Sequence, residues 1–356
     1  MKIILDAMGG DNAPLEVIKG AVMAAAEYDA VIVLVGQTET IKQCASENGL
    51  RIEPEGDGPR KIEIVEAPDI ITMEDPALSV RTKRESSMAV GLHLLKDGGG
   101  DAFVSAGNTG ALYAGASLIV GRIKGFRKAA IATVMPFTDP TLLIDSGANV
   151  SVSAENLIQF AHMGSVYMEN VLGVQSPRVG LLNNGTEPHK GTDTMIEAHK
   201  LISSDPQINF IGNVEAKTVP SGGCDVLVTD GFTGNIFLKR TEGLGSLLFG
   251  RIKAMYKKNA LTKLSAAMVM KDMKAMKKEF DASEYGGAPI LGISKPVIKT
   301  HGSSDALEVK NAVRQAISYV NSGVIMRLAE SVGAASPAQP AAPQPQPAAP
   351  QPEDKQ

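Results

Sequence analysis

The sequence predicts an α/β protein, built as a three-layer α/β/α sandwich around one mostly parallel sheet. Two observations support this fold class. Short runs rich in β-branched residues alternate with amphipathic stretches, which is the pattern of successive βαβ units. The alternation begins at residue 2 and continues to residue 229 of 356. In such a sheet, ligands bind beyond the carboxyl ends of the strands, so the loops that follow strands are the first candidates for a site.

Nine runs have the length and composition of strands, and helical patterns lie between them. The predicted strands are 2–6, 31–36, 62–66, 102–105, 129–134, 142–145, 178–182, 208–212 and 225–229. The predicted helices are 14–26, 38–47, 86–96, 153–172, 192–203, 244–256, 261–280 and 304–329. Asn12 is expected to cap the first helix, because Asn is a favoured N-cap residue and Pro14 suits a first turn.

The last third of the chain departs from this rhythm. Helical patterns cluster after residue 229, which predicts a late helical protrusion at about 244–281 on a domain that spans 1–333. Residues 334–356 are rich in Pro, Ala and Gln and contain no bulky apolar side chain. Because such a segment cannot offset the entropy of ordering, it is expected to be a disordered tail.

The composition argues against several classes of protein. Hydrophobic residues make up 44% and charged residues 21%, which is ordinary for a folded chain. The net charge of −4 gives no reason to expect a nucleic-acid partner. Two cysteines, Cys44 and Cys224, fit a reducing compartment better than a disulfide framework. The apolar stretch after Met1 is too short for a secretion signal, so we expect a cytoplasmic protein.

The clearest candidate for a ligand site is a glycine turn between a strand and a helix. Gly107, Asn108, Thr109 and Gly110 follow the strand 102–105 and precede a run of small residues with helical composition. Free backbone N–H groups and the positive end of the helix dipole make such a turn suited to phosphate. The alternative is a simple turn that Asn108 caps. The turn has neither the Walker nor the GxGxxG pattern.

Two later turns of the same kind follow predicted strands, and cations lie nearby. The turns are NNGTEPHKG and VTDGFTGN, which contribute Asn184, Gly185, Thr186, Lys190, Asp230, Gly231 and Asn235. The segment SVRTKRESS offers Arg81 and Lys83, of which arginine is suited to bidentate phosphate contacts. The alternative for these cations is a solvated basic surface.

His301 is the best candidate for acid–base chemistry. It lies in the loop THGSSDA with Ser303, directly before a predicted helix. A structural loop histidine is the alternative. No histidine or cysteine pair has the spacing HxxxH, HExxH or CxxC, so no metal site is predicted.

Residues 251–280 reverse the charge balance of the chain. They carry nine basic residues and two acidic ones. On a helical wheel, Val269, Met273, Met276 and Phe280 form one apolar stripe. This stripe is predicted to contact an anionic membrane, and the alternatives are packing on the body and contact within a dimer.

Eight segments, taken in order, resemble the bacterial phosphate acyltransferase family. They are DAMGGDNAP, SVRTKRESSM, SAGNTGALYAGA, DSGANV, NNGTEPHKG, VTDGFTGN, YGGAPILG and THGSSDA, and they extend over essentially the whole of 1–333. The resemblance implies a fold related to phosphotransacetylases and to isocitrate and isopropylmalate dehydrogenases. It also implies a cytosolic homodimer that associates peripherally with the membrane. The THGSSDA turn is similar to the Ser-Arg-Gly turn of phosphotransacetylases, with His301 replacing the arginine.

The resemblance further implies a reaction without a cofactor. Inorganic phosphate attacks the thioester of a fatty acyl group on acyl carrier protein and gives acyl phosphate for phospholipid (phosphatidic acid) synthesis. Acyl carrier protein is then a partner, and the membrane acyl-phosphate:glycerol-3-phosphate acyltransferase is a further candidate. Because phosphate is the nucleophile, the protein must hold it near the carbonyl, stabilise the oxyanion and protonate the departing thiolate.

Under this hypothesis the catalytic residues are His301, Lys190 and Asn108. The 108–110 turn holds phosphate together with Arg81 or Lys83. The remaining predicted substrate contacts are Gly107, Thr109, Gly110, Asn184, Gly185, Thr186, Asp230, Gly231, Asn235 and Ser303. Two alternatives stay open: a metal- and NAD-dependent decarboxylating dehydrogenase on the related fold, and a non-catalytic membrane scaffold.

Overall fold

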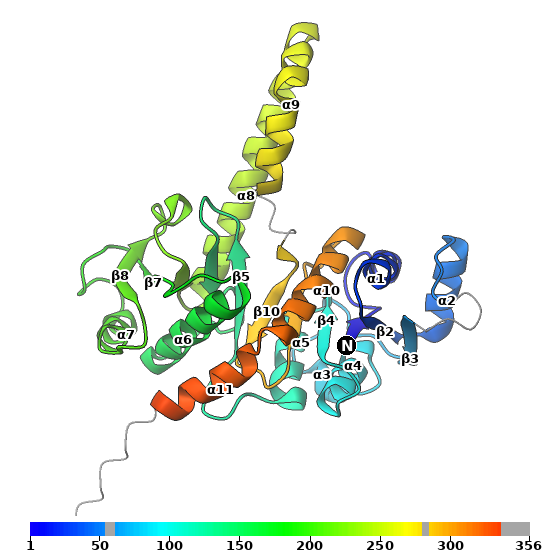
Figure 1. Ribbon diagram of the computed structural model, residues 1–356, viewed down its shortest axis with the longest axis horizontal. Coiled ribbons are helices and arrows are strands. Elements are labelled where there is room, and N and C mark those ends of the chain that lie inside the picture. The colour runs from blue at the N-terminus through cyan, green and yellow to red at the C-terminus, as the bar shows by residue number, and fades with distance from the viewer. Residues whose placement is uncertain (54–60, 280–284, 336–356) are drawn as a thin grey trace, which may run out of the picture.

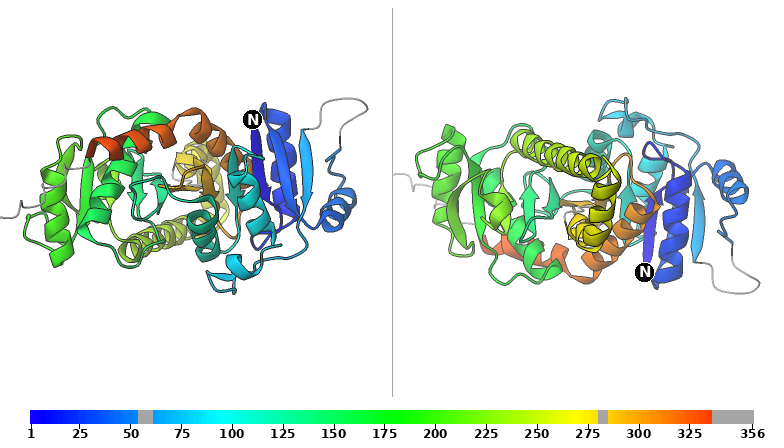
Figure 2. Two further views of the ribbon diagram at one scale, coloured as in Figure 1. Left: turned by 90° about the horizontal axis from the view of Figure 1, so that it is seen from below. Right: turned by 90° about the horizontal axis from the view of Figure 1, so that it is seen from above.

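The computed structural model describes residues 1–53, 61–279 and 285–335, and the predicted disordered tail falls almost entirely outside them. In the described part of the chain, one sheet of eleven strands is covered by helices on both faces (Figures 1 and 2). The strands are β1 (Lys2–Asp6), β2 (Val31–Gly36), β3 (Ile62–Glu66), β4 (Ala102–Ser105), β5 (Ala130–Met135), β6 (Thr141–Ile144), β7 (Val179–Asn183), β8 (Phe210–Glu215), β9 (Val226–Val228), β10 (Ala288–Leu291) and β11 (Val297–Lys299).

The strand order is β3-β2-β1-β4-β11-β10-β5-β6-β9-β7-β8, and strand direction reverses in the middle. Seven pairings are parallel. The three antiparallel pairings adjoin one another, between β11 and β10, β10 and β5, and β5 and β6. The strands β3 to β11 and the strands β6 to β8 in this order therefore run in opposite directions. We call the edge where β1, β4 and β11 end the first edge, and the edge where β6, β9 and β7 end the second edge.

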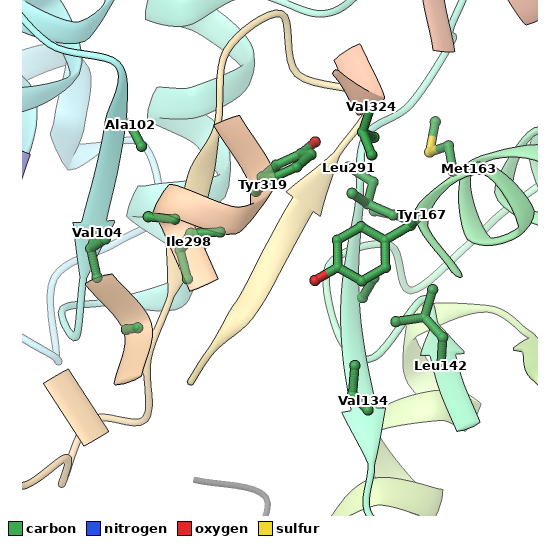
Figure 3. Packing of buried hydrophobic residues seen from close by; sticks show 14 of the residues in the cluster. Ala102, Val104, Val134, Leu142, Met163, Tyr167, Leu291, Ile298, Tyr319 and Val324 are labelled. Atoms are coloured by element: carbon green, nitrogen blue, oxygen red, sulfur yellow. The ribbon is translucent and has the colours of Figure 1, made fainter. Parts of the chain in front are cut away.

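One face of the sheet, here face A, is covered by a continuous layer of helices. They are α1 (Leu15–Glu27), α2 (Thr38–Glu47), α6 (Ala154–Val171), α7 (Asp193–Ser203), α10 (Ala306–Asn321) and α11 (Val324–Ala335). Tyr167 of α6 and Tyr319 of α10 meet edge to face, with ring centroids 5.9 Å apart. Figure 3 shows these rings beside strand residues such as Leu291 and Ile298. Burial of this single core joins the two halves of the sheet.

The opposite face, face B, carries two separate hydrophobic clusters. The first lies under α3 (Ser79–Thr82), α4 (Ser87–Lys96), α5 (Thr109–Gly115) and the π-helical turn η1 (Ala116–Val120). The second lies under α8 (Gly231–Tyr256), whose Phe237 and Leu238 pack against it, and the short 3-10 helix η2 (Val219–Ser221) contributes Val219. In Figure 2, α10 and α11 lie on one side of the sheet and α8 and α5 on the other.

The predicted protrusion is the distal part of α8 together with α9 (Ala260–Glu279), which project from the body as a pair (Figure 1). The predicted helix at 244–256 is thus the end of a helix that starts at Gly231. In the part of the chain that the structure describes, no helix combines the length and apolarity that crossing a membrane requires.

Most predicted elements are confirmed. The strands at 2–6, 31–36, 62–66 and 102–105 match residue for residue, and the five later strands shift by up to three residues. The prediction missed β10 and β11. The predicted helix at 304–329 is two helices, because Gly323 adopts φ of 67° between them. Asn12 does not cap α1, which has Pro14 at its N-cap and no capping side chain.

Gly234 tests how α8 is seated on the sheet. A Cβ at this position would lie 2.0 Å from the carbonyl oxygen of Asp145. We expect Gly234→Ala to lower the free energy of unfolding by at least about 2–3 kcal/mol, measured by urea denaturation.

Gly243→Ala is the matched control. Gly243 also lies in α8, but nothing lies within 4 Å of a Cβ there. Alanine should raise helix stability at that position by up to about 1 kcal/mol. Equal effects of the two substitutions would contradict the tight contact at Gly234.

Candidate active site

Polar residues separate the two hydrophobic clusters of face B. The hydroxyl of Thr133, on β5, donates to Oγ of Ser146 at 2.8 Å, and Ser146 Oγ donates to the carbonyl of Ile131 at 3.1 Å. Lys299 ends β11 and is only 9% exposed. It lies on face B because Ile298 belongs to the core of face A and strand residues alternate between faces. We call Thr133, Ser146 and Lys299 the polar strip.

At the first edge, the loops after β1, β4 and β11 interlock. Ser105 Oγ donates to Asp6 Oδ2 at 2.7 Å and accepts the N–H of Gly107 at 3.0 Å. The N–H of Asp11 donates to the carbonyl of Gly302 at 2.7 Å. Three consecutive parallel strands of the sheet thus deliver their loops to one junction, as the carboxyl ends of parallel strands do.

His301 is exposed at this junction, and its ring is oriented by the turn that follows. The backbone N–H of Ser303 donates to His301 Nδ1 at 3.3 Å, and Ser303 Oγ lies 2.8 Å from the same nitrogen. Because a backbone N–H can only donate, Nδ1 accepts, and the neutral ring carries its proton on Nε2. Asn12 holds the turn by donating from Nδ2 to the carbonyl of Ser303 at 2.9 Å. The Nε2–H group remains available to a ligand.

Lys299 is a candidate that sequence reasoning missed. Its ammonium donates to the carbonyl of Ala106 at 3.2 Å and to the carbonyl of Thr300. The sequence does contain a feature that could have indicated it: the short apolar run VIK ends in a lysine directly before THGSS. The run is only three residues long and follows Pro296, which is why it did not stand out as a strand.

Burial shifts the pKa values of Asp6 and Lys299 in the direction that favours the uncharged form of each group. Asp6 is 2% exposed, and its burial raises the pKa of the carboxyl, against hydrogen bonds from Ser87 and Ser105. Burial lowers the pKa of Lys299 to about 8; the charge of Asp6 opposes this shift, and the charge of Lys239, on α8, adds to it. The pKa of Lys299 is therefore affected by charged groups both on α8 (Lys239) and at the first edge (Asp6).

The other end of face B is organised by Asp145, which follows β6. Tyr113 of α5 donates to Asn149 Oδ1 at 2.9 Å, which ties α5 to the same loop. Burial raises the pKa of Tyr113, and the charge of Asp145 adds to the effect. The Asp145 carboxylate accepts five N–H hydrogen bonds of 2.7–3.2 Å, from Ile131, Gly147, Ala148 and both the backbone and side chain of Asn149. It is thus a structural anchor.

Two of the three predicted residues at the start of α8, Asp230 and Gly231, have structural roles. Asp230 is the N-cap, accepting the N–H of Thr233 at 2.8 Å. A Cβ on Gly231 would lie 2.7 Å from the backbone nitrogen of Asn149, so this glycine permits contact with a loop. Asn235 lies beside the exposed Gly147, the residue after Ser146, since its Oδ1 would lie 3.6 Å from a Cβ on Gly147.

Asn108 has its side chain fully engaged in structure. Oδ1 accepts the N–H of Ala111 at 3.0 Å and caps α5. A Cβ on Gly110 would lie 3.0 Å from Cβ of Ala77, so the 72–77 segment covers this helix start. The amide Nδ2 donates at 2.8–3.3 Å to three carbonyls of that segment, those of Thr72, Met73 and Asp75. The capping alternative therefore describes Asn108 better than a direct phosphate contact.

The cations before α4 differ in their surroundings. Lys83 Nζ lies 2.8 Å from Asp75 Oδ2 and 2.9 Å from the carbonyl of Ile70, so this lysine braces the same covering segment. Arg81 and Thr109 are exposed. The N–H of Gly107 is already used by Ser105. Of this predicted group, Arg81 and Thr109 are the residues free to meet a ligand.

The loop after β7 does not join the His301 junction. Asn184, Gly185, Thr186 and Lys190 follow a strand that ends at the second edge. β7 is five strands from β11, or about 24 Å across the sheet. The structure therefore places Lys190 and Asn184 apart from His301, because strand direction reverses between β11 and β7, and their role as phosphate contacts stays a prediction. These residues share the second edge with Asp230.

The exposed apolar stripe of α9 also differs from the predicted one. Val269 and Met273 are half-buried on the side of α9 that packs along α8, and Phe280 and the side chain of Met276 fall outside the described residues. The most exposed large apolar residues of α9 are Leu261, Leu264 and Met268, at 76%, 66% and 81%. These three positions recur on one helical face.

Across the residues that the structure describes, no three His, Cys, Asp or Glu side chains form a group able to hold a metal ion. The groups that the structure presents at the first edge are a histidine N–H donor and a buried ammonium. This set can bind and stabilise an oxyanion.

The fold belongs to a class seen in several solved enzymes. A phosphotransacetylase of Streptococcus pyogenes superposes with a TM-score of 0.61 and 17% identity over 92% of this chain and 94% of its own. The EutD phosphotransacetylase of Staphylococcus aureus gives 0.60 and 16%, over 90% and 94%. A 4-hydroxythreonine-4-phosphate dehydrogenase of Klebsiella pneumoniae gives 0.54 and 15%, over 90% and 99%. The expected relation to phosphotransacetylases is confirmed at the level of the fold.

The family is defined by sequence. Residues 1–327 match the family described as "Fatty acid synthesis protein", and the chain belongs to it. A phosphate acyltransferase of Alkaliphilus oremlandii is 46% identical over 335 residues, which cover 93% of this chain and 97% of that protein. A phosphate acyltransferase of Moorella thermoacetica is 45% identical over 336 residues, covering 94% and 96%.

The buried charge of Lys299 predicts a pH dependence of stability. Its pKa is about 8 in the folded protein and roughly 10.4 in an unfolded chain. Between these values the unfolded state binds more protons, so the stability of the wild type rises with pH. Lys299→Met should lack this rise. Its stability relative to wild type should fall by up to about 3 kcal/mol between pH 7 and pH 10.5, measured by urea unfolding.

The charged groups that act on Lys299 are Asp6, Asp11 and Lys239. They are present in both proteins, so the difference between the two curves isolates Lys299. A constant difference across this pH range would show that the ammonium is not desolvated.

Proposed function

We propose that this chain transfers a fatty acyl group from acyl carrier protein to inorganic phosphate and forms acyl phosphate for phospholipid synthesis. The proposal is supported by family membership together with the imidazole and the buried ammonium that meet at the first edge. A phosphate oxygen attacks the thioester carbonyl, the carbon–sulfur bond breaks, and the thiolate takes up a proton. No nucleophile of the protein and no cofactor is needed.

His301 is proposed as the group that supports the tetrahedral intermediate or protonates the thiolate. The support for this role is its Nε2–H donor, held by Ser303 in an exposed turn. Arg81 and Thr109, exposed near the same edge, are proposed as additional phosphate contacts. Asn108 and Lys83 are proposed to act through the 72–77 segment, which they position.

The acyl thioester is proposed to lie along α8, between the two edges. Asn235 and Lys239 lie on this helix, about 6 Å apart along its axis. Because the central strands have only three to six residues, the edges are separated by a short span that an extended thioester can cross. Asn184, Thr186, Lys190 and Asp230 are then proposed to bind the carrier-linked end at the second edge.

Two further proposals concern the surroundings of the enzyme. We propose a homodimer and peripheral contact with an anionic membrane, which would deliver acyl phosphate to the membrane acyl-phosphate:glycerol-3-phosphate acyltransferase. The basic segment 251–280 and the exposed residues Leu261, Leu264 and Met268 of α9 support the membrane contact. The half-buried Val269 and Met273 are reassigned to packing on α8.

The alternatives differ in what the protein consumes. A decarboxylating dehydrogenase would reduce a nicotinamide cofactor in the presence of Mg²⁺. A non-catalytic scaffold would bind vesicles without consuming thioester. Incubation with acyl-acyl carrier protein and phosphate, followed by detection of acyl phosphate, separates the three functions. The same assay with acyl coenzyme A measures carrier selectivity.

His301→Ala is the first activity test. Loss of a general acid or oxyanion donor should lower kcat for acyl phosphate formation by at least about 100-fold. The melting temperature should change little, because the ring is exposed.

His93→Ala is the matched control, since His93 is exposed on α4, away from the junction. It should retain wild-type kcat. Unchanged kcat in His301→Ala would remove His301 from the chemistry.

The double substitution Leu264→Glu and Met268→Glu tests the membrane contact. Placing two carboxylates on the exposed stripe of α9 should lower binding to anionic vesicles at least about tenfold in sedimentation assays. Met326→Glu, a 70% exposed methionine on α11, serves as the control. Equal loss in both proteins would point to general charge repulsion.

A further inference from the structure

Lys299 combines burial, a positive charge and incomplete pairing. Of the three donors of its ammonium, two are used by the carbonyls of Ala106 and Thr300. Asp6 and Asp11 act on it as longer-range charges, and neither contacts it as an ion pair in the described part of the chain. A buried charge without a close partner is costly to folding, so stability alone does not explain this lysine.

The position of Lys299 in the sheet places this charge where a ligand could contact it. β11 lies between β4 and β10, directly beside the reversal of strand direction. The side chain therefore sits on the polar strip, where the hydrophobic clusters under α5 and α8 are separated. Two residues further on, His301 presents its Nε2–H from the same loop. The ammonium and the imidazole donor thus belong to residues two positions apart in the same segment at the first edge.

We infer that Lys299 is a direct phosphate ligand of the site, with its third N–H donating to an oxygen of inorganic phosphate. This inference rests on the proposed function. Phosphate fits better than a neutral ligand, because an anion supplies the close negative partner that the ammonium lacks. Lys239, on α8, acts on Lys299 as a longer-range positive charge, and its own ammonium is paired with Glu242 at 2.8 Å.

The test compares Lys299→Met with wild type in phosphate-free buffer to which inorganic phosphate is added. Methionine keeps most of the volume and removes the charge, and replacing a buried charge by an apolar group is often neutral or stabilising. We expect Lys299→Met to fold with a melting temperature at least equal to that of wild type at pH 7. The rise in melting temperature that phosphate causes in wild type should be lost.

Steady-state kinetics give the second readout. Loss of one charge-assisted hydrogen bond should raise KM for phosphate at least about tenfold. KM for acyl-acyl carrier protein should change less than about threefold, which distinguishes free phosphate from the phosphodiester of the carrier as the bound anion. Lys61→Met is the control, because Lys61 also donates to a backbone carbonyl, that of Ala25, but at the far strand β3.

The outcomes separate the inference from the proposed function. If wild type forms acyl phosphate and Lys299→Met retains its KM for phosphate, the inference is overturned and the function stands. If wild type forms no acyl phosphate but phosphate still stabilises it through Lys299, the function fails and the anion site stands. If Lys299→Met does not fold, Lys299→Gln replaces it, and an unchanged phosphate response there overturns the inference.

Discussion

The arrangement of the whole molecule depends on β10, which runs antiparallel to both of its neighbours. Together with the antiparallel pair of β5 and β6, it reverses strand direction across the sheet. Loops that follow strands of the two halves consequently leave at opposite edges. Face A tolerates the reversal because side-chain packing is indifferent to strand direction, and a single core spans both halves. On face B the hydrophobic core is not continuous, and the polar residues Thr133, Ser146 and Lys299 lie between its two clusters.

Elements with local signals could be predicted from sequence. The first four strands match residue for residue because each is a short segment centred on β-branched or other apolar residues. β10 and β11 could not be found this way, since their segment, APILGISKPVIK, is short and interrupted by glycine and prolines. Their pairing is decided by tertiary contacts between residues about 150 or more positions apart.

The candidate site was predictable only in parts, for the same reason. The turn with His301 and Ser303 carries its chemistry within three residues, and in the structure Ser303 lies against His301 Nδ1. The grouping of Lys190 with His301 required the strand order and direction, which composition does not encode. Asn108 shows a further limit: an amide at a helix start has the same sequence signature whether it binds an anion or holds a neighbouring segment.

The distribution of charge explains how the junction can serve an anionic substrate. Burial disfavours the charged forms of both Asp6 and Lys299, while the well-paired Asp145 is satisfied by N–H donors alone. Asp145 is therefore saturated with donors, and Lys239 is paired with Glu242 at 2.8 Å, whereas the ammonium of Lys299 contacts only backbone carbonyls. Such preorganised donors need no rearrangement when a substrate anion arrives.

A crystal structure of the protein with arsenate, an analogue of phosphate, is the most direct measurement of where the anion binds. Arsenate should occupy face B between α5 and α8, within hydrogen-bond distance of Lys299 Nζ and on the side of His301 Nε2. Arsenate bound only at the second edge, beside Lys190 and the start of α8, would contradict the assignment of the site to the first edge.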